Sequence, residues 1–270
     1  MQHPPFTLLR CASAGIEAVT ADTALVFGRH THDQYGVGLI ERGAQRSASG
    51  RGVVEAGAGD IITVNPGEVH DGAPIGDGGR SWRMLYLDPA LVAELGADVA
   101  GGWTASAIEF SRPTVSDGRI AGRFRRLFHA VTAGEPAARD GCSTDQALLL
   151  LLGDLLQARR AEGRAVPAGI ARARARIDDD PGAAPTLADL AHEAGLGRHQ
   201  FLRAFARATG LTPHAYLVQR RIHHARRLIA RGLPLADAAA DAGFADQSHM
   251  TRLFVRSFGM SPGAYARATA

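Results

Sequence analysis

The stretch "GFADQSHMTRLFVRSFGMSPGAY", residues 243–265, has a looser counterpart upstream in "GLGRHQFLRAFARATGLTPHAY", residues 195–216. Aligned from their ends, the two copies carry the same residue types 49 positions apart, whereas their first glycines are 48 apart. The matched pairs are Phe205 with Phe254, Gly210 with Gly259, Pro213 with Pro262, and Tyr216 with Tyr265. A repeat with matched turn-forming and aromatic residues indicates one supersecondary unit that the chain uses twice.

Each copy predicts two short helices joined by a tight turn. The segments "TLADLAHEAGL" and "PLADAAADAGF" each predict a helix that ends at glycine, because glycine accepts the positive φ of such a turn. A second helix is expected after Gly197 in the first copy and after Asp246 in the second, and aspartate is the stronger N-cap. Two short helices around a turn of three or four residues describe a helix-turn-helix.

The second helix of each copy has an apolar face and a polar face. The apolar positions, expected to be buried, are Phe201 and Phe205 in the first copy and Met250, Leu253, Phe254 and Phe258 in the second. Arginine recurs on the polar face at matched positions, 203 with 252 and 207 with 256. A solvated surface explains many such stripes, but recurrence at matched positions favours reading of the DNA major groove.

The segment between the copies, "TPHAYLVQRRIHHARRLIARG", predicts one connecting helix. A helix of about 18–20 residues is roughly 27–30 Å long. One turn of DNA advances about 34 Å, so such a connector can hold two helices in successive major-groove segments on one side of a duplex.

The charge is divided unevenly along the chain. Residues 1–168 hold 16 Arg and 19 acidic residues, a net charge of −3, whereas residues 169–270 hold 14 Arg and 8 acidic residues, a net charge of +6. The chain contains no lysine, so its 30 Lys+Arg residues are all arginine. Arginine is the residue suited to bidentate contacts with phosphate and guanine. A polyanionic partner is therefore expected only at the C-terminal part.

The sequence also predicts the compartment. Two cysteines, Cys11 and Cys142, make no disulfide framework, and the N-terminal residues contain no long apolar segment typical of a signal peptide. The longest aliphatic run, Leu148 to Leu152, is far shorter than the roughly 18 residues that span a bilayer. We expect a soluble, cytoplasmic protein with no membrane partner.

The C-terminal hundred residues resemble the AraC/XylS family of bacterial transcription regulators. The resemblance covers about residues 170–268 and is carried by "ADAGFADQSHMTRLFVRSFGMSPGAYAR", preceded by "QRRIHHARRLI" and the weaker first copy. It implies binding to double-stranded DNA by two helix-turn-helix motifs bridged by one helix. The sequence departs from the family at Gly197, where serine is frequent, and at Leu202, an apolar residue at a reading position.

Carried over by position, the resemblance assigns roles to ten residues. Base readers are expected at Arg198, His199, Leu202 and Arg203 in the first copy, and at Gln247, Ser248, His249 and Arg252 in the second. Arg207 and Arg256 are expected to contact phosphates.

The N-terminal part predicts a β-rich domain. Short apolar runs between residues 5 and 110 alternate with turn signals at roughly 8–12-residue spacing, as in small barrels and sandwiches. Regulators of this family and length usually carry a cupin-like effector barrel in front, so the resemblance implies an α+β multidomain protein. The expected divisions are an effector domain at 1–112, a helical dimerisation segment at 113–162, a linker at 163–169 and the DNA-binding domain at 170–270.

The helical segment ends in a broad apolar face, which two different contacts could explain. Leu148, Leu149, Leu152, Leu155 and Leu156 recur at helical spacing. The face could pack on the β domain, or it could also serve a partner subunit, and the second option predicts a homodimer.

Three histidines are expected to converge in the N-terminal domain. The segments "RHTHDQYGVG" and "GAGDIITVNPGEVHDG" resemble the two sequence motifs of the cupin barrel. His30 and His32 point the same way on a strand, and His70 follows a Pro-Gly turn. Three converging histidines can bind Fe, Mn, Ni or Zn, which opens the alternative of a metal-dependent cupin enzyme or a metal sensor.

The residues after His32 argue against that alternative. Metal-binding cupins usually add a glutamate here, where this chain has Tyr35, Gly36 and Val37. We therefore expect His30, His32, Tyr35 and His70 to line a pocket for an organic effector, or the histidines to be hydrogen-bonded in the barrel, with no cofactor. The sequence contains no P-loop, dinucleotide fingerprint or nucleophile elbow, so no catalytic residues and no enzyme activity are predicted.

Together these features predict a transcription regulator whose three parts have different functions. The front barrel binds a small-molecule effector, the middle helices dimerise the chain, and the back domain binds a promoter. An activator of this kind would also contact RNA polymerase.

Overall fold

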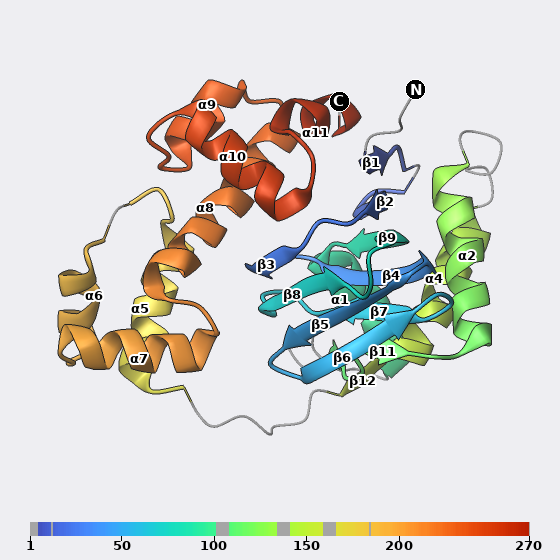
Figure 1. The fold of residues 1–270 in the computed structure, drawn as a ribbon, viewed down its shortest axis with the longest axis horizontal. Helices are drawn as coiled ribbons and strands as arrows, with labels where there is room; N and C mark the ends of the chain where they lie inside the picture. The colour runs from blue at the N-terminus through green and yellow to red at the C-terminus, as the bar shows by residue number, and fades with distance from the viewer. Residues whose placement is uncertain are drawn as a thin grey trace. The chain divides into compact units, whose positions relative to one another are not determined.

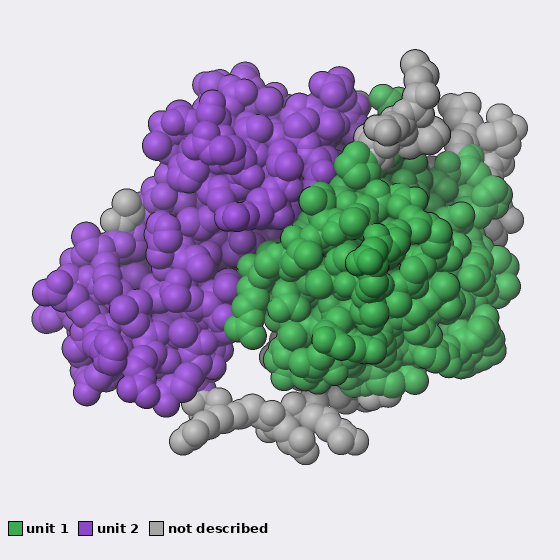
Figure 2. Space-filling view, in the orientation of Figure 1, with its two compact units in different colours: residues 1–161 green, residues 162–270 purple. Residues whose placement is uncertain are grey.

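The computed structural model describes residues 5–11, 13–100, 108–133, 141–158, 166–183 and 185–269. The chain forms two compact units, residues 1–161 and residues 162–270, which are coloured separately in Figure 2. The first unit is rich in strands and the second is helical (Figure 1), so the fold is of the expected α+β multidomain class.

Six strands of the first unit form an antiparallel sheet in the order β1-β2-β9-β4-β7-β11 (Figure 1). Its members are β1 (Phe6–Leu9), β2 (Ile16–Thr23), β4 (Tyr35–Arg42), β7 (Ile61–Val64), β9 (Arg80–Leu87) and β11 (Thr114–Val115). Strand β4 is buried on both faces from Tyr35 to Ile40, and its residues Tyr35, Val37 and Leu39 pack in one core with the helices.

The second sheet has four strands in the order β3-β8-β5-β6. Its members are β3 (Phe27–His30), β5 (Ala44–Ser49), β6 (Gly52–Gly57) and β8 (His70–Pro74). The chain passes from the first sheet to the second at Gly43, which has a φ of 73° and whose missing Cβ would collide with the Gly79 carbonyl oxygen. The strands of these two sheets thus form a cupin-like fold that is not one closed ring.

Helices cover one face of the six-stranded sheet. They are α1 (Pro89–Ala100), α2 (Gly118–Thr132) and α4 (Gly141–Leu155), and the core between them and the sheet includes Leu39, Leu85, Phe124 and Leu152, all fully buried. The Asp117 side chain caps α2 by accepting from the backbone nitrogens of Arg119 and Ile120.

The apolar face expected for a partner subunit is used mainly inside the unit. Leu148, Leu152 and Leu155 are buried in this core, whereas Leu150 keeps 45% of its surface exposed. The segment 113–162 is also not wholly helical. It begins with β11, and after α4 the chain forms β12 (Leu156–Ala158), which pairs with β10 (Ile108–Phe110). Leu156 is therefore a strand residue, because it pairs with Phe110 instead of continuing the helix.

The second unit consists of seven helices within the described residues. They are α5 (Ala168–Asp179), α6 (Leu187–Glu193), α7 (Arg198–Thr209), α8 (Pro213–Ala230), α9 (Leu235–Asp241), α10 (Gln247–Phe258) and α11 (Pro262–Thr269). Helix α5 begins at Ala168, inside the expected linker 163–169. Gly169 lets this helix pack closely on Ala194, because a Cβ here would approach the Ala194 carbonyl oxygen to 2.6 Å. Residues 163–165 of that linker lie outside the described residues.

The core of the second unit has two similar halves, one for each copy of the repeat. Phe201 and Phe205 of α7 are fully buried in the first half, and Met250 and Phe254 of α10 are fully buried in the second. Helix α8 contacts α7 on one side and α9 and α10 on the other, so it belongs to both halves. Among the helices that the structure describes, none has the length and apolar character that a membrane crossing requires.

Candidate nucleic-acid interface and effector site

The two helix-turn-helix copies share their turn geometry but differ at the N-cap of the second helix. Gly195 and Gly243 both have a positive φ, 68° and 79°. In the first copy the backbone nitrogen of Gly197 donates to Gln200 Oε1 at 3.3 Å. In the second copy Asp246 Oδ1 accepts from the backbone nitrogen of His249 at 2.7 Å, so only the second copy has a side-chain N-cap.

After the second helix of each copy, a glycine ends the helix and another helix begins within a few residues. Gly210 and Gly259 end α7 and α10 in the left-handed conformation. Tyr216 then packs its ring 5.6 Å from that of Phe205, and Tyr265 packs 5.7 Å from Phe254. The repeat seen in the sequence is therefore a repeat of structure.

Helices α7 and α10, here called the reading helices, present most of the predicted DNA contacts to solvent. Exposed residues are Arg198, His199, Arg203, Arg207, Gln247, Ser248, Arg252 and Arg256. Leu202 and His249 are half-buried, and the His249 ring lies edge-on to Phe244 at 5.5 Å. Leu253 and Phe258, expected in the core, are half-buried as well.

The arginines of the reading helices differ from other arginines of the unit in their partners. Within the described residues, no carboxylate forms an ion pair with Arg203, Arg252 or Arg256. Arg176, by contrast, pairs with Glu193 at 2.9 Å, and Arg220 pairs with Asp178 at 2.9 Å. The positive charge on the reading helices is thus not locally compensated, which suits contacts to phosphate and base edges.

Helix α8 connects the two copies as a single element. It has 18 residues and is therefore about 27 Å long. Tyr216 Oη donates to Asp178 Oδ1 at 2.8 Å, and the Arg226 guanidinium lies 5.8 Å from the Phe258 ring centre. Helix α8 also contacts α7 and α10, and contacts to both copies along one helix restrict their relative movement.

In the first unit, the structure brings together His30, His32 and His70, here called the histidine cluster. His30 ends β3 and pairs with His70 at the start of β8. The backbone nitrogen of Gly67 donates to the His32 carbonyl oxygen at 2.7 Å, which holds the Pro-Gly turn beside His32. One ring nitrogen of each histidine lies within 4.8 Å of those of the other two.

Backbone carbonyls orient two of these rings. His30 Nδ1 lies 2.8 Å from the Gly28 carbonyl oxygen, and His70 Nδ1 lies 3.1 Å from that of Glu68. Because a carbonyl oxygen only accepts, each Nδ1 carries the hydrogen, and the lone pair of the neutral ring belongs to Nε2. Burial lowers the pKa of His70, which favours that neutral form.

Tyr35 does not join the cluster. It shares the face of Val37 and Leu39, its ring packs on Phe110 at 5.4 Å, and its hydroxyl donates to the Ile108 carbonyl oxygen at 3.2 Å. Tyr86 takes the expected place, with its ring 5.0 Å from that of His32. A Cβ at Gly36 would lie only 3.1 Å from Met84 Cε, so this glycine leaves room for the methionine beside it.

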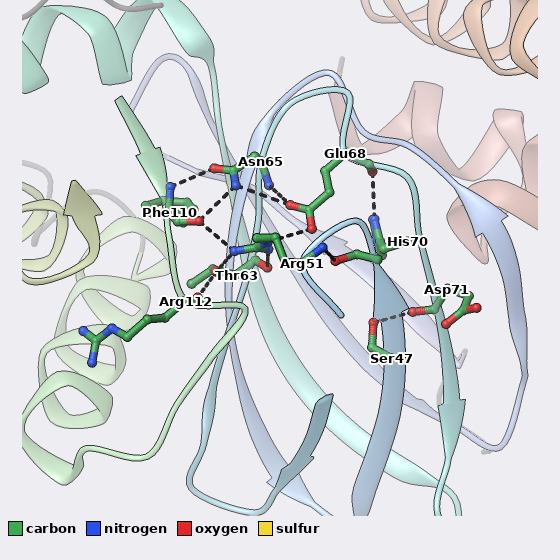
Figure 3. A network of polar contacts seen from close by, with 10 residues as sticks. Ser47, Arg51, Thr63, Asn65, Glu68, His70, Asp71, Phe110 and Arg112 are labelled. Atoms are coloured by element: carbon green, nitrogen blue, oxygen red, sulfur yellow. Dashed lines mark hydrogen bonds and ion pairs between the residues drawn. The ribbon is translucent and has the colours of Figure 1, made fainter. Parts of the chain in front are cut away.

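A network of polar contacts missed at the sequence level surrounds the turn before His70 (Figure 3). Arg51 Nε donates to Glu68 Oε1 at 2.7 Å, and the Asn65 backbone nitrogen donates to Glu68 Oε2 at 3.1 Å. The same arginine donates to the Phe110 carbonyl oxygen at 2.7 Å, and the Phe110 nitrogen donates to Asn65 Oδ1 at 2.8 Å. The network joins the His70 turn to the segment that precedes β11 and α2. In the sequence, this network could have been anticipated only from the "NPGE" turn, in which Asn65 and Glu68 are three residues apart.

Two protein-family models match the chain. Residues 13–152 match the AraC-like ligand binding domain, and residues 190–268 match a helix-turn-helix domain. Because the first match covers more than half of the chain, the protein belongs to the AraC family. It is a transcription regulator with an N-terminal ligand-binding domain and a C-terminal helix-turn-helix DNA-binding domain.

Individual relatives agree with this family. The transcriptional regulator YbfI of Bacillus subtilis is 25% identical over 231 residues, 83% of this chain and 81% of its own length. The transcriptional activator NphR of Rhodococcus sp. is 43% identical over 83 residues, 30% of this chain and 24% of its own. Fatty-acid-bound ToxT of Vibrio cholerae is similar in fold, with a TM-score of 0.56, 12% identity and coverage of 98% of this chain and 97% of ToxT.

Proposed function

We propose that this protein is a one-component regulator in which a small effector, bound at the histidine cluster, changes how the reading helices bind promoter DNA. The observation that supports DNA reading most directly is the pair of matched, locally uncompensated arginine stripes on α7 and α10. Effector binding would act by favouring one arrangement of the two units over another.

The proposed roles follow the sequence predictions with one change. Base readers are Arg198, His199, Leu202 and Arg203 on α7 and Gln247, Ser248, His249 and Arg252 on α10, with Arg207 and Arg256 on phosphates. Around the effector we place His30, His32 and His70, and we replace Tyr35 by Tyr86 because of its contact with His32. No catalytic role is assigned, so we propose a regulator without enzyme activity.

The proposal includes an assembly. We propose a homodimer formed through the helical part of residues 113–162, with the effector domain at 1–112 and the DNA-binding domain at 170–270. The exposed Leu150 on α4 supports a contact at this helix. The protein would act in the cytoplasm and, if it activates, would contact RNA polymerase.

The test is a binding measurement with the full chain. A preferred duplex is first selected from a random library, and its affinity is then measured against a scrambled duplex by fluorescence anisotropy. We expect Arg252→Ala to weaken the selected duplex by about 1–3 kcal/mol and to relax its sequence preference.

Arg172→Ala is the matched control, because this arginine lies on α5 and donates to the Glu193 carbonyl oxygen. It should leave the sequence preference unchanged. An unaltered affinity of Arg252→Ala for the selected duplex would remove this residue from the set of base readers.

A further inference from the structure

The histidine cluster is held by separate backbone contacts, so its convergence does not depend on flexible side chains alone. His30 and His70 face each other across the β3–β8 pair, and the Gly67 bond fixes the His32 backbone. His30 and His32 retain only 9% and 8% of their surface exposed. Three imidazoles are thus collected in one partly desolvated place.

Two of the three rings have the outer hydrogen bond that metal-binding histidines usually make. A ligating imidazole donates its second nitrogen to a carbonyl or carboxylate, which fixes the ring orientation and raises its basicity as a ligand. The Gly28 and Glu68 carbonyl oxygens accept from His30 and His70 in this way. In both rings Nε2 then carries the lone pair that can coordinate an ion.

The nearby carboxylates are already committed to other partners. Glu68 is held by Arg51 and by the Asn65 backbone nitrogen (Figure 3), and Asp71 Oδ1 accepts from the Ala48 nitrogen at 2.7 Å. Among the described residues, the ligand atoms that lie within 4.8 Å of one another here come from the three histidines and not from a carboxylate, so the donor set is nitrogen alone. Imidazole suits zinc, cobalt, nickel and copper, whereas magnesium and calcium require oxygen ligands.

The missing glutamate does not prevent such a site. Three histidines are a sufficient protein ligand set for zinc, with the remaining position open to water or another ligand. Bonds of about 2.1 Å require nitrogens about 3.4 Å apart in a tetrahedral site, so ring nitrogens that now lie within 4.8 Å of one another need to approach by up to about 1.4 Å. Binding of an ion requires this approach, and His32, just beyond the end of β3, is not held by the pairing of that strand.

We propose that His30, His32 and His70 bind one divalent transition-metal ion through their imidazole nitrogens, and that this ion is the effector of the N-terminal unit. The inference rests on the proposed function for its regulatory part, because it names the class of effector. Metal binding itself can be measured without DNA.

The first experiment titrates the chelator-treated, tag-free full chain with Co²⁺, followed by visible absorbance, and then displaces Co²⁺ with Zn²⁺. We expect one ion per chain. Loss of a hydrogen-bond partner of a metal-binding histidine typically lowers the metal affinity about 10–100-fold. Because His70→Gln and His32→Ala each remove a proposed ligand itself, we expect each variant to lose at least that much affinity for Co²⁺. His129→Ala, an exposed histidine on α2, should bind as the unaltered chain does.

Circular dichroism of each variant shows whether it is folded. His70 is a residue of β8, whereas His32 lies outside the strands, so a loss of binding in His32→Ala is not explained by disruption of β8. The site would be overturned if the unaltered chain bound no Co²⁺, or if both histidine variants were folded and bound Co²⁺ as tightly as the unaltered chain does.

The second experiment measures affinity for the selected duplex with and without Zn²⁺. We expect at least a fivefold change in the unaltered chain and none in His32→Ala. Stoichiometric metal binding with unchanged DNA affinity would overturn the ion as effector. Absence of DNA binding in every condition would instead overturn the proposed function and leave the metal site standing.

Discussion

At the scale of single residues, what an arginine does in this chain depends on what it contacts. Arg80 is almost fully buried, and burial lowers its pKa to about 10, so it stays charged at neutral pH. It donates to Gln45 Oε1 and the Leu25 carbonyl oxygen, and its guanidinium lies 4.9 Å from the Trp82 ring centre. Arg256, by contrast, is exposed in the last turn of α10. Only the second kind is available to a polyanion.

Arg256 provides a residue-scale prediction. If it contacts phosphate, Arg256→Ala should weaken binding to every duplex alike and reduce the slope of log K against log salt by about 1, because one fewer counterion is released. The measurement is the anisotropy titration repeated over a series of salt concentrations. Arg267→Ala on α11 removes an exposed arginine of the same unit and should leave the slope unchanged. A loss confined to one base position would make Arg256 a base reader instead.

At the scale of elements, α5 and α8 are joined through a polar centre at Asp178. Tyr216 and Arg220 of α8 both contact Asp178 Oδ1, and Arg174 of α5 reaches its other oxygen. Burial first, and then the hydrogen bond to Asp178, raises the pKa of Tyr216 to about 12. The folded unit therefore holds the phenolic proton more tightly than the unfolded chain does.

This shift sets the direction of a pH dependence. Because the folded pKa lies above the usual value of 10.0, the contribution of Tyr216 is complete below about pH 10 and is lost as the pH rises toward 12. We expect Tyr216→Phe to cost about 1.5–3 kcal/mol at neutral pH, the range for a hydrogen bond to a charged group. The cost should shrink between pH 10 and 12.

The measurement is urea unfolding of both chains, followed by the helical circular-dichroism signal, at pH 8, 10 and 11. Comparing the two chains at each pH cancels the titration of all other groups. A difference in unfolding free energy that stays constant with pH would show that the hydroxyl does not titrate as described.

The elements also show which parts of the fold and site could be predicted from the sequence. The repeat was predictable because its signals are local: glycine at each turn, an N-cap at Asp246, and buried rings at helical spacing. The convergence of the three histidines was predicted from strand alternation and the Pro-Gly turn, but His32 lies just beyond the end of β3, so only His30 and His70 are strand residues.

Other features depend on pairing between distant segments. Tyr35 points away from the histidine cluster because residues 31–34 interrupt the strand and reset its alternation. The contact between Arg51 and Glu68 exists only once β6 and β7 are in place. Periodicity alone also could not tell that the leucines of α4 pack mainly inside their own unit.

At the scale of the whole molecule, the duplication implies a footprint. Two reading helices joined by a connector of about 27 Å match successive major-groove segments about 34 Å apart, so one chain should contact about two turns of DNA. Affinity should therefore rise with duplex length from one turn to two. A homodimer with paired half-sites would extend the rise to about four turns.

Variants of the first copy test whether it causes the rise in affinity with duplex length. We expect Arg203→Ala combined with Arg207→Ala to reduce the affinity for the two-turn duplex to nearly that for the one-turn duplex, because only α10 would then contact DNA strongly. The copies are unequal, since α7 lacks a side-chain N-cap and carries Leu202 at a reading position. The matched change in α10, Arg252→Ala with Arg256→Ala, should therefore weaken the two-turn duplex more. Equal losses from the two pairs would contradict this ranking, and an affinity independent of duplex length would contradict simultaneous contact by both copies.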